Sequence, residues 1–289
     1  MGSSADPLIP HDQSVVFFDG IFSEPRLNHP EGIAIDADGN IWCGGEAGEI
    51  FKIAADGSGI ELMGSTGGFT LGLAFDSQGQ LYTCDLKHAA VFRFDPATGS
   101  LTQFATGDGA RNMKVPNVPV VDARRNCLYV SDSHDFHDVG PGVWRFDLET
   151  GEGSLWYDRS LRFANGMALS ADGASLYVAE TFARRVVRIP IQADGSAGEA
   201  ELYLSDIPAL PDGLALDTDG RLYVTCYEPS RIYRRETDGT LTLLIDDPEA
   251  HTLCHPTNIA FRGTDLFNSN LGRWHITRTP VGAAGQPLP

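Results

Sequence analysis

Long apolar runs are missing from this sequence, and so is an excess of positive charge. No window of the 289 residues reaches the roughly 18 to 20 uninterrupted apolar residues of a membrane span, although 42% of the residues are hydrophobic. The start, MGSSADPLIPHD, lacks the basic and apolar segments of a signal peptide. With 21 basic and 39 acidic residues, the formal charge of -18 would repel a phosphate backbone. We therefore expect a soluble globular protein with neither a membrane nor a nucleic-acid partner.

Paired cysteines and several catalytic motifs are also missing. The five cysteines, an odd number, include no CxxC and no zinc-finger spacing, so we expect buried free thiols in a reducing compartment and a cytoplasmic protein. The sequence has no Gly-Lys-Ser/Thr phosphate loop, no GxSxG elbow and no HExxH pair. A serine hydrolase and a zinc protease of the common kinds are therefore disfavoured.

What the sequence does contain is a repeat. An apolar pair recurs as IWCGG at 41, LYTCD at 81, LYVSD at 128, LYVAE at 176, LYVTC at 222 and LFNSN at 266. Each pair is preceded by an apolar segment such as DGLALDTDG at 212 and followed by an alternating strand such as VFRF at 91. Alternation with Asp-Gly and Thr-Gly punctuation is typical of antiparallel hairpins. Six copies of one unit thus fill nearly the whole chain.

The repeat predicts an all-β fold, a six-bladed β-propeller with four antiparallel strands per blade. Five copies contain a fourth strand, and the sixth runs out of chain. The segment SVVFFDG at 14–20 has no copy of its own, so it is expected to supply the missing strand and close the ring. An open solenoid, the alternative, would leave this segment unexplained. We expect residues 1–289 to form one domain, with residues 1–13 as a flexible tail.

Polar residues open several of the first strands, which line the channel of a propeller. The residues in this register are Glu31, Leu71, Asn117, Asn165, Asp212 and Thr257. Asn-Gly and Asp-Gly are also ordinary turn sequences, but Asn117 is followed by valine. Oxygen-bearing side chains at one register of separate blades therefore favour a shared ligand on the axis.

Two carboxylates and two amides suit one divalent cation. Glu31, Asn117, Asn165 and Asp212 supply hard oxygens and a formal charge of -2. Ca²⁺ takes about six to eight oxygen ligands, so positions would stay open for water or substrate. Mg²⁺, Mn²⁺ and Fe²⁺ are alternatives, and Zn²⁺ is a poorer one because no His or Cys occupies this register.

The chain resembles the regucalcin and gluconolactonase family of six-bladed propellers, which is related to diisopropyl fluorophosphatase. The matching stretches are HPEGIAID at 29, VPNVPVVD at 115, FANGMALSADG at 163, LPDGLALDTDG at 210 and HPTNIAF at 255. The resemblance covers essentially the whole chain and implies a divalent metal, commonly calcium, on Glu31, Asn117, Asn165 and Asp212. It also implies lactone hydrolysis. The sugar-lactonase branch usually has Arg where this chain has Val115, which disfavours a polyol lactone.

The function expected from these residues is hydrolysis of a small-molecule lactone by a metal-polarised carbonyl and an attacking water. Asp212 is the candidate general base, partly because the family's equivalent Asp has this role, and Glu31 is the second candidate. Phosphotriester hydrolysis at the same metal is one alternative. The other is a non-catalytic propeller that binds calcium structurally.

Two further groups of residues are candidates for roles near the channel. Substrate contacts are expected from the loops that hold Arg111, Asn112, Lys114, His134 and His137, together with Asp135 and Phe136. A flexible polar loop is favoured over a zinc site for the stretch HDFHD. Asp85, Asp132 and Glu180 share the fifth position of their second strands, which indicates either a second cation site or a polar network.

Overall fold

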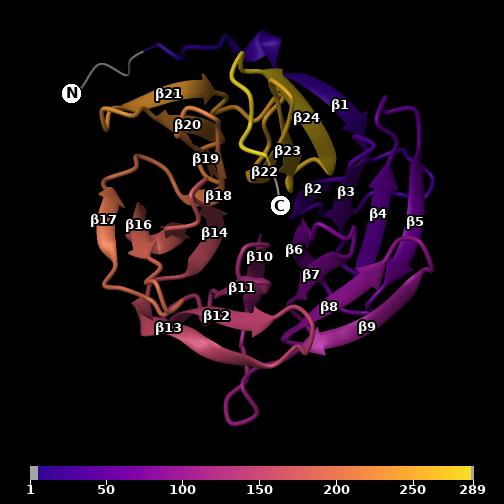
Figure 1. The fold of residues 1–289 in the computed structure, drawn as a ribbon. Coiled ribbons are helices and arrows are strands. Elements are labelled where there is room, and N and C mark those ends of the chain that lie inside the picture. Colours follow the sequence, from indigo (N-terminus) through magenta and orange to yellow (C-terminus); the bar gives the residue numbers. More distant parts are fainter. Residues whose placement is uncertain (1–5, 288–289) are drawn as a thin grey trace.

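The structure, a computed structural model, describes residues 6–287 and folds them into a ring of six four-stranded antiparallel sheets (Figure 1). Blade one contains β2 (Ile33–Ile35), β3 (Ile41–Gly44), β4 (Glu49–Ile53) and β5 (Ile60–Ser65). Blade two contains β6 (Thr70–Phe75), β7 (Leu81–Asp85), β8 (Ala90–Asp95) and β9 (Ser100–Ala105). Blade three contains β10 (Pro116–Asp122), β11 (Cys127–Asp132), β12 (Gly140–Asp147) and β13 (Gly153–Leu161).

The second half of the ring repeats this order. Blade four contains β14 (Ala164–Leu169), β15 (Ser175–Glu180), β16 (Arg185–Pro190) and β17 (Glu201–Leu204). Blade five contains β18 (Pro211–Leu216), β19 (Leu222–Cys226), β20 (Arg231–Arg235) and β21 (Leu241–Asp246). Blade six contains β22 (Pro256–Arg262), β23 (Asp265–Asn270) and β24 (His275–Pro280), and its outer strand is β1 (Val15–Asp19). The prediction of a six-bladed propeller closed by an N-terminal strand is confirmed.

The segment before β1 contains a short 3-10 helix, η1 (His11–Gln13). Residues 1–5 of the predicted tail lie outside the described residues. The backbone N–H groups of Leu8 and Ile9 donate to the carbonyls of Leu243 and Leu244, at 3.1 and 2.9 Å. The segment therefore crosses from the closing strand to the outer strand of blade five.

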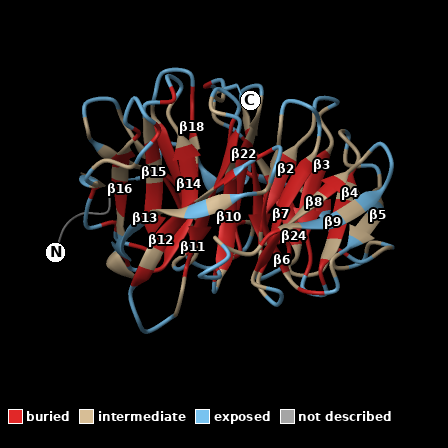
Figure 2. Ribbon diagram, turned by 60° about the horizontal axis from the view of Figure 1, so that its bottom comes forward, coloured by how far each residue is buried: buried red, intermediate tan, exposed pale blue. Residues whose placement is uncertain are grey.

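The sequence repeat marks the core of each blade. The first residue of each recurring apolar pair has no exposed surface; these residues are Ile41, Leu81, Leu128, Leu176, Leu222 and Leu266. Burial is concentrated on the inner strands, while the outer strands such as β5 and β9 carry the exposed positions (Figure 2). Because full burial of one large apolar side chain stabilises a fold by about 1.5–3 kcal/mol, this register anchors all six blades.

A cavity of about 300 Å³ follows the axis of the ring, between the first strands. Its lining runs from Val118 and Asn258 to Leu169 and Leu216 at the other end, where Gln286 also lines it. The Gln286 side chain donates to the carbonyl of Leu169 at 3.1 Å, and its backbone N–H donates to the carbonyl of Leu216 at 2.9 Å. The C-terminal segment therefore reaches the middle of the ring at this end (Figure 1).

All five cysteines are free and buried, as the sequence predicted. The reducing, cytoplasmic compartment inferred from them stays a prediction. Among residues 6–287, no helix has the length and apolar character needed to cross a membrane.

Candidate functional site

The predicted site residues lie at the beginning of the innermost strands. Asn117, Asn165 and Asp212 are each the second residue of their strands, β10, β14 and β18, while Glu31 lies two residues before β2. The two asparagines and Asp212 are at most 5% exposed, and Glu31 is half-buried. Neighbouring first strands contact one another around the ring, including β10 with β14, β14 with β18, and β22 with β2. These four residues are called the candidate centre below.

Glycines next to the candidate centre allow this close approach. A Cβ atom on Gly166 would lie 2.1 Å from the backbone oxygen of Asp212, and one on Gly213 would lie 2.5 Å from that of Thr257. Both glycines lie inside strands, and neither has a positive φ. The Asn-Gly and Asp-Gly pairs are therefore not turns. Their glycines let adjacent inner strands pack backbone against backbone.

Hydroxyl groups fix the orientation of the two amides. The Asn117 Nδ2 donates to Ser133 Oγ at 2.9 Å, and this hydroxyl donates to the carbonyl of Ala164 in the next blade at 2.8 Å. The Asn165 Nδ2 donates in the same way to Thr181 Oγ1 at 3.2 Å, and this hydroxyl donates to the carbonyl of Pro211 at 2.8 Å. Because the amide nitrogens are held by these hydroxyls, the amide oxygens are left available.

Three buried oxygens of the candidate centre accept no hydrogen bond. They are Asn117 Oδ1, Asn165 Oδ1 and Asp212 Oδ1. A buried polar atom without a partner costs about 1–3 kcal/mol, so three on successive blades call for a common partner. Since all three are oxygen acceptors, a hard cation fits them and an anion does not.

Glu31 is held by its backbone carbonyl. This oxygen accepts hydrogen bonds from Thr257 Oγ1 at 2.7 Å, Ser269 Oγ at 2.8 Å and Asn258 Nδ2 at 3.1 Å. All three donors belong to blade six, which lies between the blades of Asp212 and Glu31. A blade that contributes no carboxylate to the candidate centre therefore positions one that does.

The two carboxylates of the candidate centre share a desolvated region. Burial, and secondly the negative charge of Asp212, raises the pKa of Glu31 well above its ordinary value. Burial also raises the pKa of Asp212 to about 7, with a hydrogen bond to Asn165 acting in the opposite direction. A nearby cation would favour the ionised form of both groups.

Tyr227 and His255, which the sequence interpretation did not single out, also lie beside the candidate centre. Burial raises the pKa of Tyr227, and the next causes are the charges of Glu31 and Asp212. The Tyr227 ring stacks on His255 with 4.7 Å between ring centroids. The His255 Nδ1 lies 3.1 Å from the Tyr227 carbonyl and 3.1 Å from a carboxylate oxygen of Glu228. His255 is two residues before Thr257, so the register of the repeat could have indicated it.

The predicted substrate residues lie on two loops that precede and follow the first hairpin of blade three. Arg111 is exposed, and its guanidinium donates to Asp108 Oδ2 at 2.7 and 3.0 Å. The side chains of Lys114 and His134 meet at 3.0 Å.

Asn112 and His137, the other two predicted contacts, are exposed. The backbone of Asn112 forms an isolated β-bridge with Gly107, and the His137 N–H donates to Asp135 Oδ1 at 2.7 Å. The structure thus brings Lys114 and His134 together, and the substrate roles of all five residues stay predictions.

The three acids at the ends of second strands form polar networks rather than a second cation site. Asp132 accepts the backbone N–H groups of Lys114, Val115 and His134, each at 2.9 Å, and the indole N–H of Trp144 at 3.2 Å.

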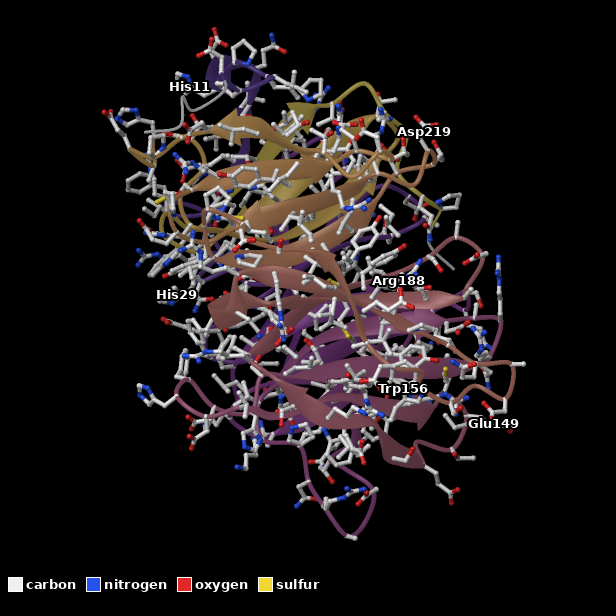
Figure 3. The ribbon with its side chains drawn as sticks, turned by 90° about the vertical axis from the view of Figure 1, so that its left-hand side faces the viewer. His11, His29, Glu149, Trp156, Arg188 and Asp219 are labelled. Atoms are coloured by element: carbon white, nitrogen blue, oxygen red, sulfur yellow. The ribbon has the colours of Figure 1, made fainter. Side chains whose placement is uncertain are left out.

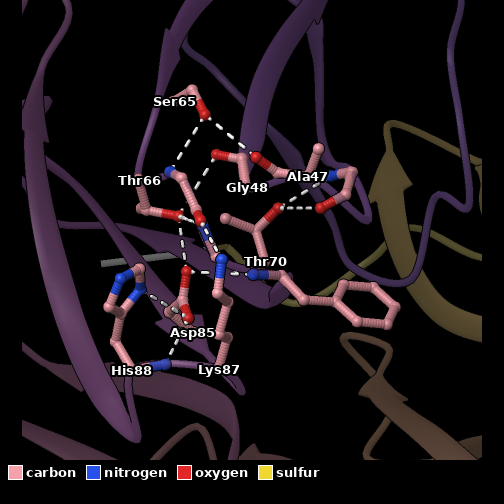
Figure 4. A network of polar contacts seen from close by, with 12 residues as sticks. Ala47, Gly48, Ser65, Thr66, Thr70, Asp85, Lys87 and His88 are labelled. Atoms are coloured by element: carbon pink, nitrogen blue, oxygen red, sulfur yellow. Dashed lines mark hydrogen bonds and ion pairs between the residues drawn. The ribbon is translucent and has the colours of Figure 1, made fainter.

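The other two acids act in the same way in their own blades. Asp85 accepts the N–H groups of Phe69 and His88, at 3.2 and 2.8 Å, and the Thr66 hydroxyl (Figure 4). Glu180 accepts the N–H of Arg162 at 2.8 Å and pairs with Arg185. Asp85, Asp132 and Glu180, called the loop clamps below, each hold the loop that leads into the first strand of their blade.

The candidate centre has the ligand chemistry of a hard-cation site. Two carboxylates and two amide oxygens give the charge of -2 that matches one divalent ion, and Ca²⁺ accepts such donors. Within residues 6–287, no group of three or more His, Cys, Asp or Glu side chains is placed to hold a metal ion. This agrees with a site in which half of the protein ligands are amides. The stretch HDFHD is thus not part of such a group.

The structure is similar to solved propellers of two named functions. A gluconolactonase from Xanthomonas campestris aligns with a TM-score of 0.77 and 21% identity, over 92% of this chain and 89% of that one. A calcium-binding regucalcin from Agrobacterium tumefaciens aligns with a TM-score of 0.73 and 19% identity, over 90% of this chain and 91% of that one. These likenesses concern the fold.

Sequence relatives carry names from more than one class. Protein strictosidine synthase-like 6 of Arabidopsis thaliana is 30% identical over 217 residues, which cover 68% of this chain and 56% of that protein. The 6-deoxy-6-sulfogluconolactonase of Pseudomonas putida is 25% identical over 252 residues, which cover 72% of this chain and 84% of that protein. The match spans about half the length of the first curated relatives, at 56% for strictosidine synthase-like 4 and 54% for an adipocyte plasma membrane-associated protein of Salmo salar.

Family models match both the body of the chain and its first blade. The model described as strictosidine synthase-like, N-terminal, matches residues 22–53. The model described as SMP-30/Gluconolactonase/LRE-like region matches residues 63–268, which is more than half of the chain. The resemblance read from the sequence is confirmed, and the chain belongs to the SMP-30/gluconolactonase/LRE-like family of β-propellers.

Proposed function

We propose that this protein hydrolyses a small-molecule lactone with the help of a divalent cation held by Glu31, Asn117, Asn165 and Asp212. The observation that supports this most is the set of three buried oxygens on successive blades with no hydrogen-bond partner. Lactonase names among the relatives, including the pentonolactonase XacC of Haloferax volcanii, support the reaction class. The calcium-binding regucalcin among the structural neighbours supports Ca²⁺ as the ion.

The four residues would divide the work of binding. The amide oxygens of Asn117 and Asn165 are held in place by Ser133 and Thr181, so they would bind a cation without losing further side-chain freedom. A divalent cation bound there would polarise the lactone carbonyl, which is worth several kcal/mol of transition-state stabilisation. Ca²⁺ takes about six to eight oxygens, so four protein ligands leave room for substrate and water.

Asp212 would act first as a general base and then as a general acid. As the water oxygen bonds to the carbonyl carbon, Asp212 takes one proton from that water. When the bond between the carbonyl carbon and the ring oxygen breaks, the same carboxyl group returns the proton to the leaving oxygen. The product is a hydroxy acid, with atoms and charge in balance. General base catalysis of this kind contributes about 10²- to 10⁴-fold in rate. Glu31 stays the second candidate for this role.

The test is a panel of lactones of varied ring size and polarity, assayed after chelation and again after adding back Ca²⁺, Mg²⁺, Mn²⁺, Zn²⁺ or Fe²⁺ separately. We expect hydrolysis of at least one lactone to disappear on chelation and to return with one of these ions. Full activity after complete chelation would contradict the cation's role. Faster turnover of a fluorophosphate ester than of every lactone would favour the phosphotriesterase alternative. Cation binding without turnover of either class would favour a binding protein.

A further inference from the structure

The rim of the channel next to Asn165 carries a cluster of aromatic rings. Phe136, Phe163 and Phe182 lie with ring centroids 5.0 Å apart for Phe136 and Phe163, 4.8 Å for Phe163 and Phe182, and 6.2 Å for Phe136 and Phe182. Phe163 is buried, Phe182 is half-buried and Phe136 is 66% exposed. The three rings, called the aromatic sector below, thus form a cluster of mutually tilted rings whose outermost member faces solvent.

The aromatic sector is attached directly to the residues that orient the two amides. Phe163 is two residues before Asn165, and its carbonyl accepts the N–H of Thr181 at 3.2 Å. Phe182 follows Thr181 in the 3-10 helix η2 (Thr181–Ala183). Phe136 is three residues after Ser133, the hydroxyl partner of Asn117. The rings therefore come from blades three and four, on the side of the candidate centre that supplies its amides.

The opposite side of the rim, on blades five, six and one, carries ionisable pairs packed against single aromatic rings, Tyr227 beside His255 and Trp274 beside His29. His255 contacts the Glu228 carboxylate at 3.1 Å, and His29 pairs with Glu46. His29 lies on one face of the ring, with Glu149 and Asp219 on the other (Figure 3). The two sides of the rim thus differ in chemistry. Next to the amides, three aromatic rings contact one another, whereas next to Glu31 and Asp212 each ring contacts an imidazole that pairs with a carboxylate.

Phe163 occupies a backbone conformation that bulky residues rarely adopt. Its φ of 60° lies in the left-handed region, where an L side chain costs about 1 kcal/mol or more. Contacts with Phe136 and Phe182 on one side and the hydrogen bond from Thr181 on the other hold it there. His29 and His255 have the same left-handed conformation two residues before Glu31 and Thr257, so this conformation belongs to the turn that leads into the first strand and fixes where the Phe163 ring lies.

We infer that the aromatic sector binds the substituent of an apolar lactone, aryl or alkyl, while the ester group lies over the candidate centre. This inference rests on the proposed function and adds the substrate class to it. The three rings offer apolar area and π-faces but no hydrogen-bond donor or acceptor, so they suit a hydrocarbon group and do not suit the hydroxyls of a sugar lactone. Val115, whose carbonyl accepts the N–H of Ser133 at 2.9 Å, is a half-buried apolar residue of the same blade as Phe136.

The experiment compares a γ-lactone that carries a phenyl group on its ring with the unsubstituted γ-lactone. We expect the wild-type protein to prefer the phenyl lactone in kcat/KM. Loss of one ring contact is worth about two- to tenfold in binding, so Phe136→Ala should lower this preference by about that factor, mainly through KM. Phe136→Leu should restore part of it. Phe136 is exposed, so the fold should tolerate both changes.

Leu202→Ala is the matched control. Leu202 is 62% exposed on the outer strand β17 of blade four, far from the first strands in the blade order. We expect it to leave the preference unchanged. An equal preference in wild type and Phe136→Ala, or a preference for a polyhydroxylated lactone over the phenyl lactone, would overturn the inference. The inference would also be overturned if Leu202→Ala lowered the preference as much as Phe136→Ala does.

Binding of the corresponding phenyl-substituted lactam, measured by calorimetry, separates this inference from the proposed function. The lactam presents the same substituent on an amide ring that is much harder to hydrolyse. If no lactone is hydrolysed but the lactam binds and Phe136→Ala weakens it about two- to tenfold, the aromatic sector is a ligand site and the proposed reaction is wrong. If lactones are hydrolysed and Phe136→Ala leaves lactam binding unchanged, the reaction stands and the substrate class is wrong.

Discussion

Two sets of buried oxygen side chains lie at the same end of the inner hairpins, and only one of them is satisfied. The loop clamps Asp85, Asp132 and Glu180 begin no strand; they end second strands and accept backbone N–H groups of neighbouring loops. The candidate centre begins first strands, and three of its buried oxygens accept nothing. Both sets are polar and buried, yet one completes the fold while the other leaves acceptors open for a partner.

This difference indicates which set stabilises the fold and which set is available for function. A buried carboxylate with several N–H donors contributes to the fold, and its loss leaves those donors without partners. A buried carboxylate with an oxygen that accepts no hydrogen bond costs stability and persists where a ligand or a reaction uses it. Replacing a carboxylate of the loop clamps should therefore lower stability, whereas replacing one of the candidate centre should lower activity without lowering stability.

The largest expected effect is on turnover, from Asp212→Asn in the candidate centre. The variant keeps the shape of the side chain but cannot take a proton from water, so kcat should fall about 10²- to 10⁴-fold. Because the wild-type carboxylate is buried with an unpartnered oxygen, the melting temperature in chelator should be unchanged or higher. Steady-state kinetics and thermal unfolding check both parts.

A variant that kept wild-type turnover would remove Asp212 from the mechanism. A large drop in the melting temperature of Asp212→Asn without cation would show that Asp212 stabilises the fold, as the loop clamps do. Either result would contradict the proposed difference between the candidate centre and the loop clamps.

The next effect is on stability, from Asp132→Ala among the loop clamps. This change removes the acceptor of three backbone N–H groups and the Trp144 indole N–H. Leaving such donors buried should cost about 3 kcal/mol of unfolding free energy, measured by urea denaturation. Asp38→Ala, at an exposed turn position, is the control and should change stability by less than about 0.5 kcal/mol. Equal stability of the two variants would mean that loop clamping is energetically unimportant.

The register of the candidate centre could be predicted because the repeat is regular. An apolar pair whose first residue is fully buried in all six blades aligns the copies. Asn117, which no strand requires, therefore stands out at a position shared with Asn165 and Asp212. The orienting hydroxyls could not be predicted in the same way. Ser133 and Thr181 follow the loop clamps in ordinary polar sequence, and their role depends on a carbonyl of the next blade, which only the closed ring brings near.

The role of the loop clamps stayed open at the sequence level for a related reason. Asp132 occupies a register as regular as that of Asn117, and repetition alone does not distinguish a ligand from a network. The distinction depends on whether donors surround the oxygen, and here they are backbone N–H groups of a loop without any repeat. The pairing of Arg111 with Asp108 is likewise a local loop contact that no periodicity marks.

A third effect couples cation binding to pH. Both carboxylates have raised pKa values in the folded protein, so the native state keeps protons that the unfolded chain has already lost. The contribution of Asp212 to stability is fully present below about pH 4 and is lost as pH rises through about 7, and the contribution of Glu31 is likewise lost as pH rises. In chelator, stability should therefore fall over this window more in wild type than in Asp212→Asn.

Added Ca²⁺ should reverse this loss, because it favours the ionised carboxylates. At one hundred times its Kd, a ligand that binds only the native state stabilises it by about 2.7 kcal/mol. Thermal unfolding at about pH 5 and pH 8, with and without Ca²⁺, measures the coupling. Identical curves for wild type and Asp212→Asn under all four conditions would show that the candidate centre neither titrates nor binds this ion.

The smallest effect tests whether close strand approach assembles the candidate centre. Gly166→Ala would place a Cβ 2.1 Å from the Asp212 carbonyl, so β14 and β18 must separate. Overpacking of this kind costs about 1–3 kcal/mol, and here the same shift moves Asn165 away from Asp212. Stability and Ca²⁺ affinity should therefore fall together. Gly59→Ala is the matched control, because its Cβ would meet nothing within 4 Å. If Gly166→Ala lost stability but bound Ca²⁺ as wild type does, the spacing of these two strands would stabilise the fold without contributing to cation binding, as we expect of the loop clamps.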